Sequence, residues 1–240
     1  MKDTKTIIQV RDLKKDFHVG EITVHALKGI NLEIKEGEFV AIMGTSGSGK
    51  STMLNILGCL DKPTNGQYVL DGVSMGELGK NELAALRNNK LGFVFQAYNL
   101  LPRTTALENV ELPLFYNSKV KARERKERAV AALEAVGLAD RMHHMPNQLS
   151  GGQQQRVAVA RAVVANPHLI LADEPTGNLD SAHGEEVMNL LASLNQNGTT
   201  IIMVTHSQRD AEYAQRIIRL FDGQIINENI KAGKTEMNAI

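Results

Sequence analysis

The stretch Gly44-Thr45-Ser46-Gly47-Ser48-Gly49-Lys50-Ser51 decides the fold of this chain, because it matches the pattern G-x-x-x-x-G-K-[ST] at every specified position. The apolar run at residues 39–43 predicts a buried strand before it, and residues 51–60 carry apolar side chains at helical spacing after it. In such a strand, loop and helix unit, backbone N–H groups and the positive end of the helix dipole surround phosphate groups. The alternative is a glycine-rich turn between a strand and a helix, which the complete match and the correct flanks disfavour.

The same loop predicts which residues hold a nucleotide. Lys50 is expected to reach the β- and γ-phosphates, and Ser51 carries the hydroxyl that a Mg²⁺ ion would need as a ligand. The nucleotide-binding residues predicted in this segment are Gly44, Thr45, Ser46, Gly47, Ser48, Gly49, Lys50, Ser51 and Thr52.

An acidic pair at the end of a second apolar run predicts the other half of a nucleotide triphosphatase site. Residues 169–172 are small or apolar without alternation, which suits a central parallel strand, and Asp173 and Glu174 follow at its carboxyl end. We expect Asp173 to hold Mg²⁺ and Glu174 to act as the general base for water attack on the γ-phosphate. An ordinary exit from a strand into a turn is the alternative, and the phosphate loop elsewhere in the chain argues against it.

Further motifs resemble those of the nucleotide-binding subunits of ATP-binding cassette (ABC) transporters. Residues 93–96 resemble the Q-loop of that family, residues 149–156 its signature motif, residues 177–180 its D-loop and residues 204–206 its switch histidine. The resemblance covers roughly residues 5–225, and the signature is its most specific part because other phosphate-loop ATPases lack it. ATP and Mg²⁺ are therefore the expected cofactors.

The resemblance implies an α/β fold, with the parallel-sheet core of a P-loop (RecA-like) NTPase, an N-terminal antiparallel β-subdomain and an inserted α-helical subdomain. We expect a single ATPase domain over residues 1–228, followed by a polar tail at residues 229–240. Its core would comprise residues 1–96 and 155–228, and its helical subdomain about 97–154. Residues 7–43 are expected to form short strands separated by turns, and Cys59 to lie within the helix after the phosphate loop.

The signature motif predicts a dimer. In the family, two domains pair head to tail and the signature of one covers the γ-phosphate bound by the other. Ser150 offers a hydroxyl donor, Gly151 and Gly152 let backbone N–H groups approach closely, and Gln153 opens a helix whose dipole favours an anion. Asp180 of the D-loop is also expected near the nucleotide. A glycine turn before a packing helix is the alternative, and both descriptions can hold at once.

Three other side chains gain a role from the resemblance. Gln96 follows a strand and could bind Mg²⁺ or the attacking water, or it is a polar strand terminus. His206 follows a β-branched run and could reach the γ-phosphate, although a lone histidine at a strand end is more often a surface or packing residue. Phe17 stands where the family usually has a tyrosine that stacks on adenine, so stacking is possible but the phenolic hydroxyl is missing. The expected catalytic residues are thus Glu174, His206 and Gln96.

Composition excludes several other classes of protein. The 240 residues carry 27 basic and 27 acidic side chains, and this balance gives no bulk electrostatic attraction for nucleic acid. No run of eighteen apolar residues and no signal-peptide core occurs, so we expect neither a membrane span nor secretion. Cys59 is the only cysteine, which rules out an intramolecular disulfide and fits a reducing cytosol.

The family resemblance also implies partners and a location. We expect a second copy of the chain, and a separate integral membrane permease that binds through Gln96, residues 98–102 and the helical subdomain, at the cytoplasmic face of the inner membrane. Residues 56–61 and 92–113 most resemble the macrolide-exporter and lipoprotein-releasing branch. A soluble switch ATPase acting on nucleic acid or ribosomes, and a cell-division signalling ATPase, remain as alternatives, and no nucleic-acid partner is expected.

Overall fold

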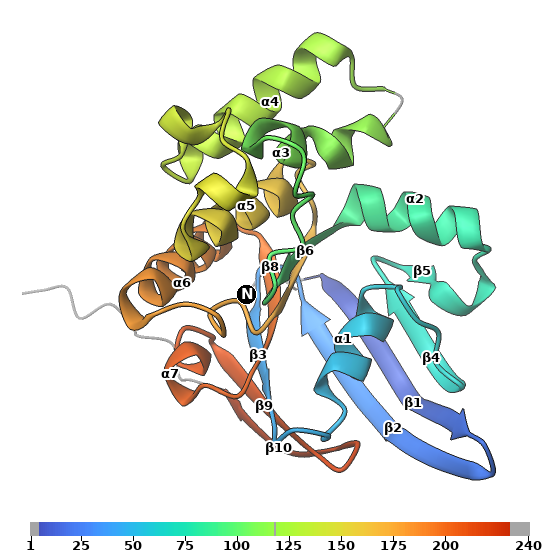
Figure 1. Cartoon of the computed structure of the whole chain (residues 1–240). Helices are drawn as coiled ribbons and strands as arrows, with labels where there is room; N and C mark the ends of the chain where they lie inside the picture. Colours follow the sequence, from blue (N-terminus) through green and yellow to red (C-terminus); the bar gives the residue numbers. More distant parts are fainter. Residues whose placement is uncertain (1–4, 118, 231–240) are drawn as a thin grey trace, which may run out of the picture.

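A six-stranded sheet runs through the middle of the computed structural model, which describes residues 5–117 and 119–230 (Figure 1). Its strand order is β10-β9-β3-β8-β7-β6, in which only the edge strand β10 runs antiparallel to its neighbour. Apolar runs without alternation form the central strands, because both faces of the sheet are covered. The strands are β3 (Phe39–Met43), β6 (Leu91–Phe95), β7 (Leu169–Asp173), β8 (Thr200–Thr205), β9 (Arg216–Phe221) and β10 (Gln224–Ile230).

A second, antiparallel sheet has the order β2-β1-β4-β5. The expectation of short strands before residue 43 was wrong in length, because β1 and β2 have 14 residues each. Shifts of register, such as the one between Val10 and Leu13, let both strands bend and continue where a regular ladder would end. The strands are β1 (Thr6–Val19), β2 (Ile22–Lys35), β4 (Asn65–Leu70) and β5 (Val73–Ser74).

Helices cover both faces of the larger sheet. The first core cluster joins α1, the antiparallel sheet and one face of β3, including Val40 and Ile42. The second joins α5, α6 and the other face of β3, including Ala41 and Met43. The helices are α1 (Lys50–Leu57), α2 (Lys80–Lys90), α3 (Ala106–Phe115), α4 (Ala122–Ala135), α5 (Gly151–Val163), α6 (Ser181–Gln196) and α7 (Gln208–Ala211), with short 3₁₀ turns η1 (Met75–Glu77), η2 (Ala139–Arg141) and η3 (Pro146–Gln148).

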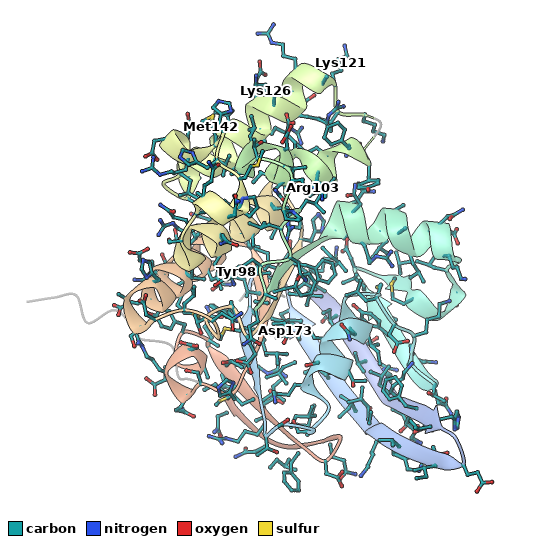
Figure 2. All side chains as sticks on the ribbon, in the orientation of Figure 1. Tyr98, Arg103, Lys121, Lys126, Met142 and Asp173 are labelled. Carbon is teal, nitrogen blue, oxygen red and sulfur yellow. The ribbon has the colours of Figure 1, made fainter. Side chains whose placement is uncertain are left out.

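The helical lobe consists of α3, α4 and the outer side of α5, which share a third core cluster (Figure 1). Leu133 of α4 and Val157 of α5 are fully buried in it, and the far side of α4 carries two i,i+4 ion pairs, Arg123 with Glu127 and Arg128 with Glu124. Figure 2 shows Lys126 of this helix and its N-cap Lys121 pointing away from the molecule. Because α5 also packs against β6 and α6, it belongs to the lobe and the core together, and no boundary at residue 154 separates them.

Two smaller expectations need correction. Cys59 lies just beyond α1 rather than within it, in a left-handed conformation with φ 54°. Strand β10 continues through Asn229 and Ile230, which pair with Ile217 and Arg216, so these two residues are not part of a tail. The rest of the expected tail, residues 231–240, lies outside the described residues. Within the described part of the chain, no helix combines the length and apolar character needed to cross a bilayer.

Candidate nucleotide-binding and hydrolysis site

The register of four parallel strands brings the predicted site residues to one edge of the larger sheet. Phe95 of β6 pairs with Asp173 of β7, which pairs with Val204 of β8, and Met43 of β3 pairs with Thr205. The residues after these strands therefore emerge side by side at the carboxyl edge, where open α/β sheets bind ligands. The first residues of the phosphate loop, the acidic pair and the predicted switch histidine all lie along this edge.

The phosphate loop is wedged between β2 and the turn before β10. A Cβ atom at Gly49, where φ is 101°, would lie 2.6 Å from the carbonyl oxygen of Ala26, so only glycine fits there. Gly223 donates its backbone N–H to the Ser48 carbonyl at 3.0 Å and holds the loop from the other side. Helix α1 begins next to Gly49 without a side-chain cap and without an acidic residue in its first turn. Its first N–H groups are thus directed at the space inside the loop.

The side chains of this loop fit a phosphate ligand. Lys50 Nζ donates to the carbonyls of Gly44 and Thr45 at 2.8 and 2.9 Å, and the third hydrogen of the ammonium remains for an anion. Ser48 Oγ is buried without a hydrogen-bond partner among the described residues, as expected for a group that lines an anion site. The exposed Ser51 hydroxyl, in the first turn of α1, could serve as a metal ligand.

Asp173, the predicted metal-binding carboxylate, is the last residue of β7 and lies at the same edge of the sheet. Burial raises its pKa, the charge of Glu174 raises it further, and the nearby Lys50 ammonium opposes both effects. A bound cation would supply the positive charge that favours the ionised form. Within residues 5–117 and 119–230 there is no group of three or more His, Cys, Asp and Glu side chains that could bind a metal by itself. The Ser51 hydroxyl and the Asp173 carboxylate offer oxygen donors, the type that Mg²⁺ prefers.

Glu174 has a strained backbone. Its φ is 44°, in the left-handed region, and it precedes Pro175, whose ring restricts the residue before it. A conformation of this kind costs roughly 1–3 kcal/mol and persists only where surrounding contacts impose it. Here the Glu174 N–H donates to the Val204 carbonyl at 2.9 Å, and the Glu174 carbonyl accepts from Gly177 N–H at 3.0 Å. These contacts point the carboxylate along the strand edge.

His206 and Thr205 hold the Glu174 side chain. His206 Nδ1 lies 2.8 Å from one carboxylate oxygen of Glu174, and Thr205 Oγ1 donates to the other at 3.2 Å. The carboxylate is mostly buried, with 15% of its side chain exposed, whereas His206 is 71% exposed. The imidazole is therefore free to contact a ligand at this edge as well as the carboxylate.

Gln96 is tied to the D-loop. Its Nε2 donates to Asn178 Oδ1 at 3.1 Å, and Asn178 Nδ2 donates back to the Gln96 carbonyl at 3.0 Å. A Cβ atom at Gly177 would lie 2.6 Å from Gln96 Nε2, so the two loops are in close contact. The structure thus places Gln96 at the predicted edge and joins it to a partner that the sequence did not reveal.

The signature motif forms the start of α5. Ser150 is the N-cap: its Oγ accepts from the Gln153 N–H at 3.3 Å, and Gln153 Oε1 accepts from the Ser150 N–H at 2.9 Å. The hydroxyl hydrogen of Ser150 stays available to a ligand. Cβ atoms at Gly151 and Gly152 would meet Tyr98, Leu179 and His183, and no atom of the phosphate loop is among these neighbours.

Asp180 caps α6, and both of its carboxylate oxygens already have hydrogen-bond partners there. It accepts from the N–H groups of Ala182 and His183 at 3.0 Å, and its other oxygen lies 2.6 Å from His183 Nδ1. The hydrogen bonds from His183 lower the pKa of Asp180.

Phe17 lies on β1 with 40% of the residue exposed, and Lys15 Nζ lies 4.9 Å from its ring centre. The exposed part of the ring can stack on a base.

Sequence reasoning missed several residues of this region. Asn178 bridges two loops, His183 packs against a signature glycine, and Gln155 of α5 donates to the Pro175 carbonyl at 2.5 Å. Gln155 stands in the quoted signature and interrupts the apolar stripe of α5, which was the available signal. For Asn178 and His183 no pattern in the sequence indicates the partner.

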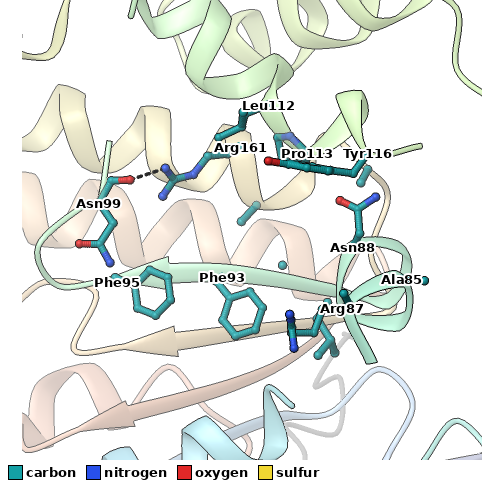
Figure 3. A pocket seen from close by; sticks show the side chains of 15 residues that line it. Ala85, Arg87, Asn88, Phe93, Phe95, Asn99, Leu112, Pro113, Tyr116 and Arg161 are labelled. Carbon is teal, nitrogen blue, oxygen red and sulfur yellow. Dashed lines mark hydrogen bonds between the residues drawn. The ribbon is translucent and has the colours of Figure 1, made fainter. Parts of the chain in front are cut away.

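A groove of about 630 Å³ opens between the helical lobe and the core (Figure 3). Its floor is the stacked ring pair Phe93 and Phe95, whose centroids lie 5.6 Å apart, and one wall carries Pro113 of α3 and Tyr116, which follows this helix. Arg161 projects into the groove from α5 and donates to the carbonyls of Tyr98 and Asn99 at 2.8 and 2.6 Å. The remaining lining residues are Ala84, Ala85, Arg87, Asn88, Leu91, Gly92, Asn99, Leu112, Ala162 and Ala165. Of residues 98–102, which we expected to form such a groove, only Asn99 lines it.

These features define a P-loop ATPase with an inserted helical lobe, as the expected fold class requires. Residues 27–177 match the family model described as ABC transporter, so the chain belongs to the ABC transporter family, as its ATP-binding and ATP-hydrolysing cassette.

Relatives agree with this assignment. The macrolide export ATP-binding/permease protein MacB of Brucella melitensis is 55% identical over 225 residues, which cover 94% of this chain and 35% of that protein. An ABC transporter ATP-binding protein of Thermotoga maritima is 54% identical over 221 residues, covering 92% of this chain and 94% of that protein. The chain thus spans about a third of the length of the MacB relatives.

A solved structure extends the comparison. The dimeric, post-hydrolysis structure of the ATP-binding cassette MJ0796 of Methanocaldococcus jannaschii, bound to ADP and Pi, is similar with a TM-score of 0.88 and 50% identity. The likeness covers 95% of this chain and 100% of that one. The fold expected from the sequence is confirmed.

Proposed function

We propose that this ATPase cassette pairs head to tail with a second copy, closes on two Mg-ATP and drives a separate membrane permease of the macrolide-exporter type. The proposal rests on the separation of two helix N-termini that can bind phosphate, those of α1 and α5. Helix α1 packs on one face of the larger sheet, whereas α5 packs on the other. One nucleotide held by Lys50 therefore needs the signature of another chain to cover it.

Within each composite site, the strand-end residues divide the chemistry. Lys50 and the N-terminus of α1 bind the phosphates. Ser51 and Asp173 would hold Mg²⁺, which when bound would neutralise charge on the phosphates. Glu174 orients and deprotonates the attacking water, and its bond to His206 fixes the carboxylate beside the γ-phosphate. Gln96 joins this edge to the D-loop and changes position with the nucleotide state.

The signature of the partner copy completes the site. Ser150 can cap α5 and still donate its hydroxyl hydrogen to a γ-phosphate oxygen, because the cap uses only its lone pair. The N-terminal N–H groups of α5 add a positive dipole end. Hydrolysis removes the γ-phosphate that both copies bind, and the dimer then opens.

The permease contact fits the groove between the lobe and the core. Its lining residues include two arginines, Arg87 and Arg161, but no carboxylate, and most of the others are apolar. Such a surface suits a short helix of the permease with an apolar face and an acidic end. Arg161 also holds the turn after Gln96, so a segment in this groove would act on the loop that senses the nucleotide. The cassette would then lie at the cytoplasmic face of the cell membrane.

Purification from the native cell tests this proposal. The chain should copurify from detergent extracts with an integral membrane protein, and a Tyr116→Glu substitution in the groove should weaken the association. Tyr116 is 75% exposed, so its replacement spares the core. Lys126→Glu, on the outer side of α4, is the matched control and should retain the membrane partner (Figure 2). Recovery with RNA or DNA and never with membranes would contradict the transporter function and favour a soluble switch ATPase.

A further inference from the structure

Gln155 is a fully buried amide in α5, five residues after the N-cap Ser150. Its Nε2 donates to the Pro175 carbonyl at 2.5 Å, and its Oε1 has no hydrogen-bond partner among the described residues. Burying an amide with half of its hydrogen-bonding capacity unmet is unfavourable, and an apolar side chain of the same size would fill this space without that cost. Core packing alone therefore does not explain a glutamine here.

The carbonyl that Gln155 holds belongs to the residue directly after Glu174. Glu174 occupies the left-handed region with φ 44°, and such a backbone persists only under external restraint. The other restraints on it, from Val204 and Gly177, are backbone hydrogen bonds of the sheet edge and the turn. The Gln155 bond differs because it comes from a side chain on the signature helix.

We propose that Gln155 is a positioning residue for ATP hydrolysis, which holds the Pro175 carbonyl and thereby fixes the Glu174 carboxylate. The inference rests on the proposed role of Glu174 in hydrolysis. One end of α5, at Ser150, faces the nucleotide of the partner copy, while Gln155 on the same helix restrains the Glu174 loop of its own chain. A rigid helix thus connects the composite site that it caps with the one in which its own Glu174 works.

The test is a Gln155→Met variant of the full chain, because methionine has nearly the same volume and no donor. We expect kcat for ATP hydrolysis to fall by about 10- to 100-fold, as for a misplaced catalytic group, while KM changes less than about twofold. Gln155→Asn keeps a buried amide but shortens the side chain by one methylene. It should therefore show the same fall in kcat with little change in KM, and it replaces the Met variant if that variant does not fold.

A matched control separates positioning from stability. Asn195 is also a buried amide, and it donates to the carbonyls of Gly37 and Thr199 at 2.9 Å, at the opposite ends of β3 and β8 from the site. Asn195→Leu should lower the melting temperature at least as much as Gln155→Met, yet keep kcat within about twofold of the wild type. Equal losses of kcat in both variants would overturn the proposal.

Combining Gln155→Met with Glu174→Gln separates the proposed role of Gln155 from that of Glu174. Glu174→Gln alone should bind ATP and form a dimer, and adding Gln155→Met should leave this ATP-dependent dimer intact. Loss of the dimer in the double variant would show that Gln155 supports the signature helix itself and would overturn the positioning role. If Glu174→Gln hydrolyses ATP at the wild-type rate, the proposed role of Glu174 fails. If that variant is slow and Gln155→Met is as active as the wild type, only the inference about Gln155 fails.

Discussion

His206 Nδ1 and a carboxylate oxygen of Glu174 lie 2.8 Å apart, so the side chains that follow β8 and β7 form one hydrogen-bonded unit. An ionised carboxylate only accepts hydrogen bonds, and Nδ1 must then carry the hydrogen. In that tautomer the hydrogen bond fixes the orientation of the imidazole, most of which is exposed at the strand edge. In the proposed mechanism, Glu174 orients the water and His206 contacts the γ-phosphate.

Removing the imidazole should impair hydrolysis more than binding. His206→Ala is expected to lower kcat by about 100-fold, the scale of losing one member of an acid–base pair, with little change in the dissociation constant of ATP. Phosphate release and equilibrium nucleotide binding measure the two effects. His168→Ala is the control, because His168 precedes β7 at the other end of the strand and should retain nearly full activity. A similar loss in both variants would contradict the role of His206.

Mixing two inactive variants should restore activity if each site is shared between chains. Lys50→Met removes the phosphate contact, and Ser150→Asp keeps the N-cap of α5 while placing a negative charge against the γ-phosphate. A mixed dimer contains one site with both defects and one intact site. We expect the mixture to hydrolyse ATP well above the sum of the separate variants. Activity no higher than that sum would place both motifs at the same site of a single chain.

Neutralising Asp173 should stabilise the protein without nucleotide. Burial and the charge of Glu174 raise the pKa of Asp173 above its ordinary 3.8, so its ionised form disfavours the folded state. That penalty is absent below the unfolded-state pKa and complete above the folded-state pKa. Asp173→Asn should therefore raise the melting temperature at pH 7, and the gain should shrink as the pH falls towards 3.8. Thermal unfolding across pH 4–7 measures it, and a lower melting temperature at pH 7 would contradict the account.

Asp71 should show the opposite dependence. Hydrogen bonds from Lys5 and Lys90 lower its pKa to about 2, with Lys90 Nζ 2.8 Å away. The bond from Lys90 ties the antiparallel sheet to the end of α2. This contribution is complete above pH 3.8 and is lost as the pH falls through about 2. Asp71→Asn should cost roughly 1–2 kcal/mol at pH 7, after allowance for solvent screening.

Urea unfolding at several pH values tests the direction of this pH dependence. The difference in unfolding free energy between wild type and Asp71→Asn should narrow below pH 3.8. Asp140 has an exposed ion pair with Arg141, and Asp140→Asn should change stability little at any pH. A cost of Asp71→Asn that stays constant with pH would show that shape rather than charge matters there.

The edge of the sheet that carries the nucleotide-binding residues was predictable, because each motif is a short continuous segment. Gly44 to Ser51 lie within one strand, loop and helix unit, and the runs before Asp173 and His206 form parallel strands that end together. Where a strand carries its functional residue directly after its last apolar position, the topology of the sheet alone brings that residue to the site. The sequence therefore predicted where these side chains lie.

Contacts between distant segments were not predictable in the same way. Gln96 and Asn178 are 82 positions apart and meet only because β6 and β7 are neighbours. The groove combines α2, β6, α3 and α5, so its aromatic floor depends on how the lobe packs and not on any one segment. The length of β1 and β2 was missed because register shifts let a strand continue where its alternation is broken.

The molar mass of a Glu174→Gln variant in solution shows whether two chains share each nucleotide. Static light scattering under saturating Mg-ATP should give twice the 26.3 kDa of one chain, because both nucleotides stay intact and join the two copies. Without nucleotide, or with ADP, the mass should return to that of one chain. If the variant binds Mg-ATP and remains a monomer, the nucleotide site is not shared between two chains.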